Sequence, residues 1–198
     1  MNINEFIGHV EKNGLAKTNK FTIFINKPFA APDNGPFNDG KSRDFKFSCE
    51  SIEFPGRGLL TSDNRIYGTS FKTPYGNDYQ EITLTLLCDR ELSEKRYFDN
   101  WIEFINPSSS FDFQYRDDYV TDLKIMQMQD DGATTYICSL LEAYPLSVGA
   151  LSANWSDDGF HRVQIRMTYR YWTSEENQFT TAEDTLPRRS GRRGGRGT

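Results

Sequence analysis

Two segments of this chain alternate between apolar and polar residues, and this alternation constrains the fold more than any other feature. In residues 80–89 every second position is apolar, and these positions are Ile82, Leu84, Leu86 and Cys88. The alternation returns in residues 162–171, where the apolar set is Val163, Ile165, Met167, Tyr169 and Tyr171. Successive side chains of a β-strand point to opposite faces, so this period predicts strands with one buried face. We therefore expect a fold built around a sheet.

Further strands are predicted at Phe21–Asn26, Phe45–Phe54, Tyr119–Gln129 and Thr134–Tyr144. The last two form a hairpin around Asp131-Gly132, a pair of residues typical of tight turns. Within Phe45–Phe54 the apolar positions change parity, which predicts a β-bulge near Glu50–Ser51.

A long helix is predicted at Ser93–Ile105, before the stop signal Asn106-Pro107. Its apolar stripe has helical spacing and consists of Phe98, Trp101, Ile102 and Ile105. A shorter amphipathic helix is expected at Asn4–Lys12. Strands dominate without regular alternation between strands and helices, so the predicted class is mostly β: a β-sandwich or barrel with one packed α-helix between strands.

Two segments between these elements lack a clear pattern. Residues 27–44, rich in Pro, Gly, Asn and Asp, are interpreted as a loop insertion. Residues 57–78 are interpreted as an extended assembly arm, because more apolar side chains lie there than a loop usually exposes: Leu59, Leu60, Ile66, Tyr67 and Phe71. We expect one domain over residues 1–172, followed by a C-terminal extension over residues 173–198.

Charge is distributed unevenly along the 198 residues, whose net charge is −5. The end of the chain carries five arginines and no acid in residues 187–198: Arg188, Arg189, Arg192, Arg193 and Arg196. Without them 18 basic residues face 28 acidic ones, so the body carries −10 and should repel nucleic acid. The tail resembles an Arg-Gly segment that binds nucleic acid, but it lacks interleaved aromatics. We favour its docking on an acidic partner surface.

No pattern in the sequence predicts catalysis, a metal site or a cofactor. His9 and His161 have no Cys or carboxylate at ligand spacing. Cys49, Cys88 and Cys138 lack Cys-x-x-Cys spacing, so we interpret them as reduced, buried cysteines of a protein made in a cytoplasm. No signal peptide and no apolar run long enough to span a bilayer are recognisable, so we expect a soluble protein without a membrane anchor.

Six segments follow one another along the chain: residues 14–23, 47–56, 79–88, 96–101, 144–151 and 155–172. Residues 47–56 carry the pattern F-x-C-x-x-x-x-x-P-x, and residues 145–151 carry P-x-x-V-G-x-L. The last segment places Trp155 before a strand that ends in Tyr171-Trp172. In this order the six segments resemble the tail tube protein family of contractile-tailed, T-even-type bacteriophages.

This resemblance implies a structural, non-enzymatic subunit of the phage virion tail. The family's hexameric rings stack into a hollow tube inside a contractile sheath, and the genome passes through the bore. The implied partners are other copies of the chain, the sheath, the baseplate and length-setting proteins. The insertion at residues 27–44 and the extension after residue 172 depart from the short form of the family. A baseplate or neck ring is therefore an alternative to the main tube.

Two other classes of function compete with this interpretation: a nucleic-acid-binding protein that acts through its Arg-Gly tail, and an enzyme with a site between subunits. Within the tube hypothesis, Arg162, Arg166 and Arg170 share one face of the last predicted strand. Cations would hold DNA in a bore. We therefore expect this arginine face to point away from the lumen, toward acidic side chains across an interface.

Overall fold

The structure, a computed structural model, describes residues 2, 3, 7, 14–31, 37, 45–65, 67–156 and 158–174. The main sheet contains the strands β1 (Phe21–Ile25), β2 (Cys49–Ile52), β5 (Ile82–Leu87), β6 (Thr121–Met128), β7 (Thr134–Val148), β8 (Arg162–Thr168) and β9 (Tyr171–Ser174). A separate hairpin consists of β3 (Gly58–Asn64) and β4 (Phe71–Asp78). The helices are α2 (Phe45–Ser48), α3 (Ser93–Ile105) and α4 (Arg116–Tyr119).

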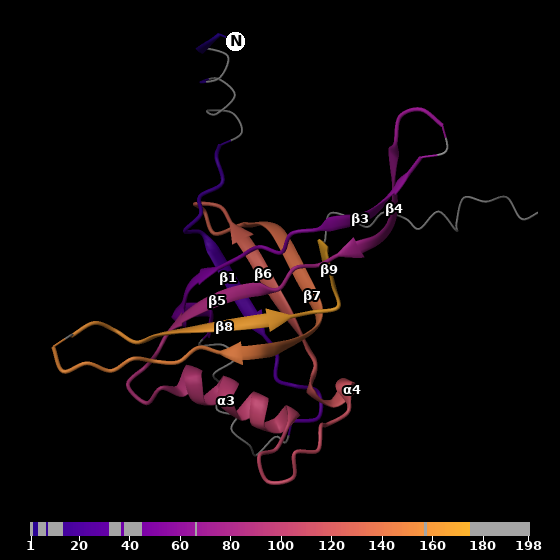
Figure 1. Ribbon diagram of the computed structural model, residues 1–198. Coiled ribbons are helices and arrows are strands. Elements are labelled where there is room, and N and C mark those ends of the chain that lie inside the picture. Colours follow the sequence, from indigo (N-terminus) through magenta and orange to yellow (C-terminus); the bar gives the residue numbers. More distant parts are fainter. Residues whose placement is uncertain are drawn as a thin grey trace, which may run out of the picture.

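Strand β7 belongs to both halves of the main sheet, whose strands cross in Figure 1. Its first part pairs with β6 and β9, and β6 pairs in turn with β1. Its second part pairs with β8, and the sheet continues through β5 to β2. Between the two parts, Glu142 has a φ of 54°, a left-handed conformation unusual for a residue other than glycine. The bend at this residue turns one sheet into two crossing layers.

The core lies between these two layers and is closed at one end by α3 (Figure 1). The inward side chains of β5 and β8 are at most 1 % exposed, as are Ile23 and Ile25 of β1 and Leu123 and Ile125 of β6. From α3, Phe98 and Trp101 are fully buried and their rings stack at 6.0 Å. The indole Nε1 of Trp101 donates a hydrogen bond of 2.9 Å to the carbonyl of Tyr119. The helix therefore contributes both apolar area and a satisfied polar anchor.

The predicted class, mostly β with one main helix, is confirmed. The long helix begins and ends where the sequence predicted, at Ser93 and Ile105. The pairing of β2 with β5 shifts register between Cys49 and Ser51, where the bulge was expected. The extended arm is a two-stranded hairpin. The N-terminal helix Asn4–Lys12 and most of the insertion at residues 27–44 lie outside the described residues.

Two strand predictions were wrong in part. Residues 45–48 form a helical turn rather than a strand, because Phe45 packs on Tyr97 and Phe98 while Phe47 is 80 % exposed. The predicted last strand is broken into β8 and β9 near Arg170. Both pieces pair with β7, and the break lies opposite the bend at Glu142. The alternation of side chains along one strand does not reveal a bend in its neighbour.

Replacing Trp101 with alanine should lower the free energy of unfolding by about 3–5 kcal/mol, since a large buried ring is lost and a cavity is left. Chemical denaturation followed by circular dichroism measures this change. The matched control is Trp155→Ala, because Trp155 is fully exposed. An equal effect of the two substitutions would contradict the placement of Trp101 at the centre of the core.

Candidate functional site

The described residues contain no group of three or more His, Cys, Asp and Glu side chains that could hold a metal ion. The three cysteines are unbonded, and burial raises the pKa of the Cys49 and Cys138 thiols to about 12. Cys49 and Cys88 are half-buried rather than fully buried. None of the described helices is long and apolar enough to cross a membrane.

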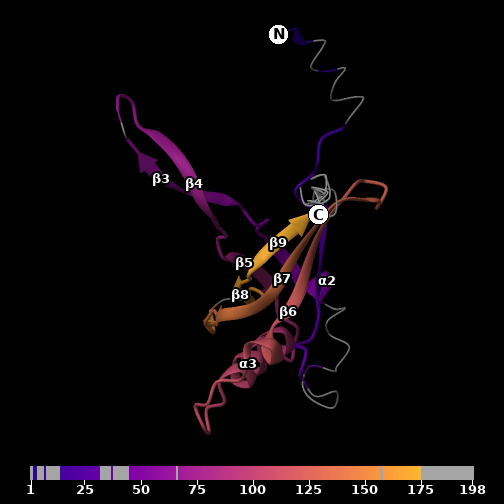
Figure 2. The same ribbon diagram turned by 90° about the vertical axis from the view of Figure 1, so that its right-hand side faces the viewer.

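The arm, defined as the β3–β4 hairpin with its connection, projects from the sheet (Figures 1 and 2). Its apolar side chains face solvent: Leu59 is 62 % exposed, Tyr67 94 % and Phe71 56 %. Tyr75, which the sequence analysis did not single out, is 70 % exposed on β4. Ile66 lies outside the described residues. An isolated hairpin is marginally stable in water, so an arm this rich in apolar area calls for a covering surface.

The arm is fixed at its base rather than along its length. The indole Nε1 of Trp172 donates a hydrogen bond of 3.1 Å to the carbonyl of Gly56. The guanidinium of Arg57 lies 5.7 Å from the ring centre of Tyr79. These contacts hold the point from which the hairpin leaves the domain, while its far end contributes nothing to the core.

The arginine face proves to be a ladder of ion pairs within the chain. Arg162 Nε lies 2.7 Å from a carboxylate oxygen of Glu50, and Arg166 pairs with Glu81. At the bend of β7, Glu142 contacts Arg170 at 2.7 Å and Arg116 at 3.2 Å. Hydrogen bonding to Glu50 raises the pKa of Arg162, and Glu142 raises that of Arg170.

The sequence analysis placed the acidic partners of these arginines across an interface, whereas the structure supplies one within the chain for each of them. The acids lie on or beside β2, β5 and β7, and only the order and register of the sheet bring them within reach of the three arginines. No local sequence signal identifies Glu50, Glu81 and Glu142 as these partners. Each guanidinium has a carboxylate beside it, which offsets its positive charge. The charge of these arginines is therefore no sufficient reason for the face to point away from a DNA-filled lumen.

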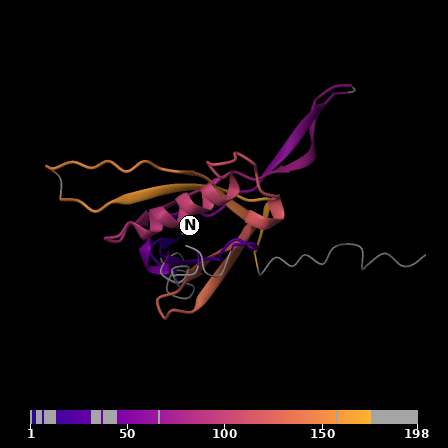
Figure 3. The ribbon, with the colours of Figure 1, turned by 90° about the horizontal axis from the view of Figure 1, so that it is seen from below.

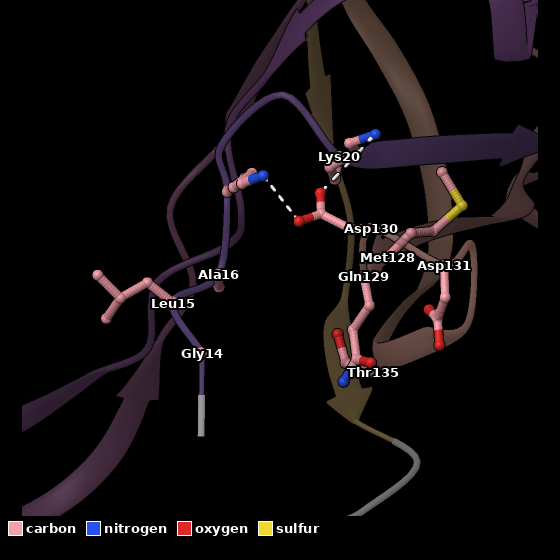
Figure 4. A pocket seen from close by; sticks show the side chains of 10 residues that line it. Gly14, Leu15, Ala16, Lys20, Met128, Gln129, Asp130, Asp131 and Thr135 are labelled. Atoms are coloured by element: carbon pink, nitrogen blue, oxygen red, sulfur yellow. Dashed lines mark hydrogen bonds and ion pairs between the residues drawn. The ribbon is translucent and has the colours of Figure 1, made fainter. Parts of the chain in front are cut away.

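A cleft of about 510 Å³ lies where the segment before β1 crosses the β6–β7 turn (Figure 4). Asp130 projects toward two lysines there, 2.7 Å from Lys17 Nζ and 3.9 Å from Lys20 Nζ. The hydrogen bond from Lys17 lowers the pKa of Asp130. Gln127 Nε2 also donates to the Lys17 carbonyl at 2.7 Å. These contacts fasten residues 14–20 to the turn, so we interpret the cleft as part of this attachment.

The remaining candidate residues fall outside the described part of the chain. They are His9 and the arginines of the basic tail, Arg188, Arg189, Arg192, Arg193 and Arg196. His161 is exposed, and its carbonyl accepts a backbone hydrogen bond of 3.0 Å from Cys88. The described contact of His161 is therefore made by its backbone, beside the pairing of β5 with β8.

Comparison with known proteins gives one family. A protein-family model described as phage tail tube protein matches residues 16–175. A search of curated proteins found no match. The fold is similar to a chain of the sheath–tube complex of the PVC extracellular contractile injection system in its extended state, with 16 % identity and a TM-score of 0.59. That alignment covers 85 % of this chain and 96 % of the other.

Two further solved structures share the fold. A chain of the PVC sheath/tube terminator in the extended state has 16 % identity and a TM-score of 0.57, over 81 % of this chain and 96 % of that one. A chain of the anti-feeding prophage baseplate has 14 % identity and a TM-score of 0.58, over 81 % of this chain and 95 % of that one.

The left-handed conformation of Glu142 yields a testable prediction. Both Glu142→Ala and Glu142→Gly remove the contacts to Arg116 and Arg170, but glycine adopts a positive φ without steric cost. We expect Glu142→Gly to be more stable than Glu142→Ala by about 1 kcal/mol in thermal unfolding. At Ser139, within the regular part of β7, we expect Ser139→Ala to be more stable than Ser139→Gly. A more stable glycine variant at both positions would contradict the bend.

Proposed function

This chain belongs to the phage tail tube protein family, and on that premise we propose that copies of it form the stacked rings of a contractile-tail tube. The family is structural and non-enzymatic. We expect the rings to be hexameric and to enclose a channel for the genome, as the resemblance in sequence implies. The protein would be made in the host cytoplasm and end in the virion tail.

The exposed arm is the observation that carries this proposal. Leu59, Leu60, Tyr67 and Phe71 are each more than 40 % exposed on one projecting hairpin. In a monomer such a hairpin would favour aggregation through its unpaired edges. In an assembly of identical subunits, a neighbouring copy covers the same area in a defined way. We propose that the arm packs against another copy in the same ring or the next.

Charge supports the passage of DNA through the assembly. The body of the chain carries −10 once the five arginines of the tail are set aside. A surface of this sign does not bind phosphates, so a duplex would slide past it. Arg162 and Arg166 each lie beside a glutamate of the same chain, which offsets the positive charge locally, and Arg170 shares Glu142 with Arg116.

We propose the ladder face as a contact surface toward a neighbour or the sheath. Arg162, Arg166 and Arg170 each have at least half of the side chain exposed. A guanidinium has five N–H donors, and each closest pair uses one nitrogen. The other donors are available to a second carboxylate, which gives geometric specificity where exposed pairs add little stability.

We propose the sheath, baseplate and length-setting proteins as further partners. Structures of similar fold include chains of a sheath–tube complex and of a baseplate. We propose the main tube, with a baseplate or neck ring as the alternative. The basic tail is proposed to dock on the outer wall, on an acidic surface of the next subunit or the sheath.

Replacing Leu59 and Leu60 together with serine should leave a folded protein that forms no long tubes, because the arm loses apolar contact area. Negative-stain electron microscopy of the purified protein measures tube length, and circular dichroism checks folding.

The matched control is the double variant Leu59→Met with Leu60→Met, which keeps the apolar area and should polymerise. Normal tubes from the serine variant would show that these two leucines are not part of the contact.

Deleting residues 187–198 separates the tube hypothesis from nucleic-acid binding through the tail. We expect the shortened chain to assemble into tubes while losing any salt-sensitive affinity for DNA, since five cations are removed. Electron microscopy and DNA-binding titrations at two salt concentrations measure the two properties. Loss of assembly with unchanged DNA binding would contradict this expectation.

A further inference from the structure

The loop between α3 and α4 exposes three aromatic side chains that no contact within the described chain uses. Phe111 is 72 % exposed, Phe113 74 % and Tyr115 84 %. They alternate with Asp112 and Gln114, so the loop presents aromatic area interrupted by polar groups. The sequence analysis passed over this segment because it follows the helix stop and shows no strand period over a useful length. Large exposed apolar area on a folded protein marks an interaction site.

Hydrogen bonds hold the aromatic loop, defined as residues 106–115, in one shape. Glu103 accepts from both the backbone and the hydroxyl of Ser108, at 2.8 Å and 2.7 Å. The backbone N–H of Phe111 donates to the Pro107 carbonyl at 2.8 Å, and that of Gln114 donates to the Ile105 carbonyl at 3.0 Å. These bonds join the loop to the C-terminal end of α3. The aromatic rings are therefore presented by a fixed backbone, which lowers the entropic cost of binding.

Phe111 adds a second sign of a built surface. Its φ of 58° lies in the left-handed region, which is unfavourable for a bulky side chain. Such strain is retained where the surroundings enforce it, and it is concentrated at binding and switching sites. Here it directs a large ring into solvent, where the described chain gains nothing from it.

The aromatic loop and the arm lie at opposite ends of the molecule. In Figure 1 the arm projects at the upper right and the loop lies below α3. After the quarter turn of Figure 2 the arm is again at the top and the loop at the bottom. When two different surfaces at opposite ends contact each other, each copy binds the next in the same direction. Contacts of this heterologous kind build rings or open stacks.

The two surfaces are complementary in charge as well as in apolar character. Around the far end of the arm, Arg65 and Lys72 outnumber Asp63 and leave one positive charge. The aromatic loop carries Asp112, and α4 adds Asp117 and Asp118 beside Arg116, which is paired with Glu142. Lys72 and Asp112 are exposed and have no ion pair among the described residues. Each therefore has its charge available for a partner.

The β7–β8 loop also exposes aromatics, with Trp155 fully exposed and Phe160 79 % exposed. It lies on the other side of the sheet from the arm in Figure 3. The described residues 151–156 of that loop show one backbone-stabilising bond, from Ser156 N–H to Asn154 at 3.1 Å. The hydrogen bonds that join the aromatic loop to α3 favour that loop as a preformed acceptor.

We propose that the aromatic loop is the acceptor for the arm of another copy, in the ring stacked next to its own. Phe111, Phe113 and Tyr115 pack on the apolar side chains at the far end of the arm, and Asp112 pairs with Lys72. This inference rests on the proposed tube function and specifies which surface the arm meets. Because each copy offers one arm and one acceptor loop, the contact repeats along the tube.

Cysteine cross-linking tests this contact without removing an aromatic side chain. Thr69→Cys places a thiol near the tip of the arm, and Gln114→Cys places one in the loop; both positions are exposed. The double variant, assembled and then treated with a short thiol-reactive cross-linker, should give a ladder of covalent multimers on a denaturing gel. An equal mixture of the two single variants should give dimers and no ladder, since each copy then has one introduced thiol. The unmodified chain, treated in the same way, measures any reaction of the native Cys49 and Cys88.

Electron microscopy of the same samples separates this inference from the proposed function. Tubes that form normally but give no ladder would overturn the arm–loop contact and leave the tube function standing. If the unmodified chain forms neither rings nor tubes, the proposed function fails, and the inference fails with it.

Charge exchange gives an independent measurement of the same contact. Lys72→Asp and Asp112→Lys should each shorten the tubes, and the two together should restore at least half of the original length. Failure of the double variant to recover length, while each single variant folds normally, would overturn the pairing of these two residues.

Discussion

The bend of β7 at Glu142 is the constraint on which the rest of the fold depends. One strand of 15 residues supplies partners to β6 and β9 before the bend and to β8 after it. The bend requires a positive φ from a glutamate, and the surroundings compensate: Asp122 accepts the Glu142 N–H at 3.3 Å, and two arginines contact its carboxylate. Since the sheet layers meet along this strand, the core, the helix that closes it and the break between β8 and β9 all follow from its path.

The chain divides its apolar residues between two uses. One set fills the closed core between the sheet layers and α3, where side chains from β1, β5, β6 and β8 are fully buried. The other set is exposed on segments that leave the domain, namely the arm and the aromatic loop. A monomer needs the first set alone to fold. The second set lowers the free energy only when another surface covers it, and we propose that neighbouring copies supply that surface.

The charged residues fall into the same two groups: some are paired within the chain, and others have no ion pair among the described residues. In the ion-pair ladder, Glu50 and Glu81 each offset one arginine and Glu142 is shared by Arg170 and Arg116, so this face does not attract DNA strongly. Lys72 on the arm and Asp112 in the aromatic loop differ, because no ion pair of the described residues uses them. We propose that these two charges help to select a neighbour.

The sequence by itself determined the elements whose signal is local. The spacing of Phe98 and Trp101 together with the stop at Asn106-Pro107 gave α3 its limits, and alternation in residues 82–87 gave β5 its buried face. The excess of apolar residues in 57–78 marked the arm before its hairpin pairing was known. The six matching segments also identified the family, because family motifs are written in residue order.

Only the tertiary structure decided the features that arise between distant segments. Phe45 is buried in a helical turn because its ring packs against Tyr97 and Phe98. Arg162 on β8 reaches across β5 to Glu50 on β2, a contact that depends on the order of the strands in the sheet. The break between β8 and β9 lies opposite the bend of β7, which is some 30 residues earlier in the chain. Phe111 is exposed because hydrogen bonds to α3 fix the loop that carries it. Periodicity reports which face of an element is apolar, whereas strand order, register and bends determine what that face meets.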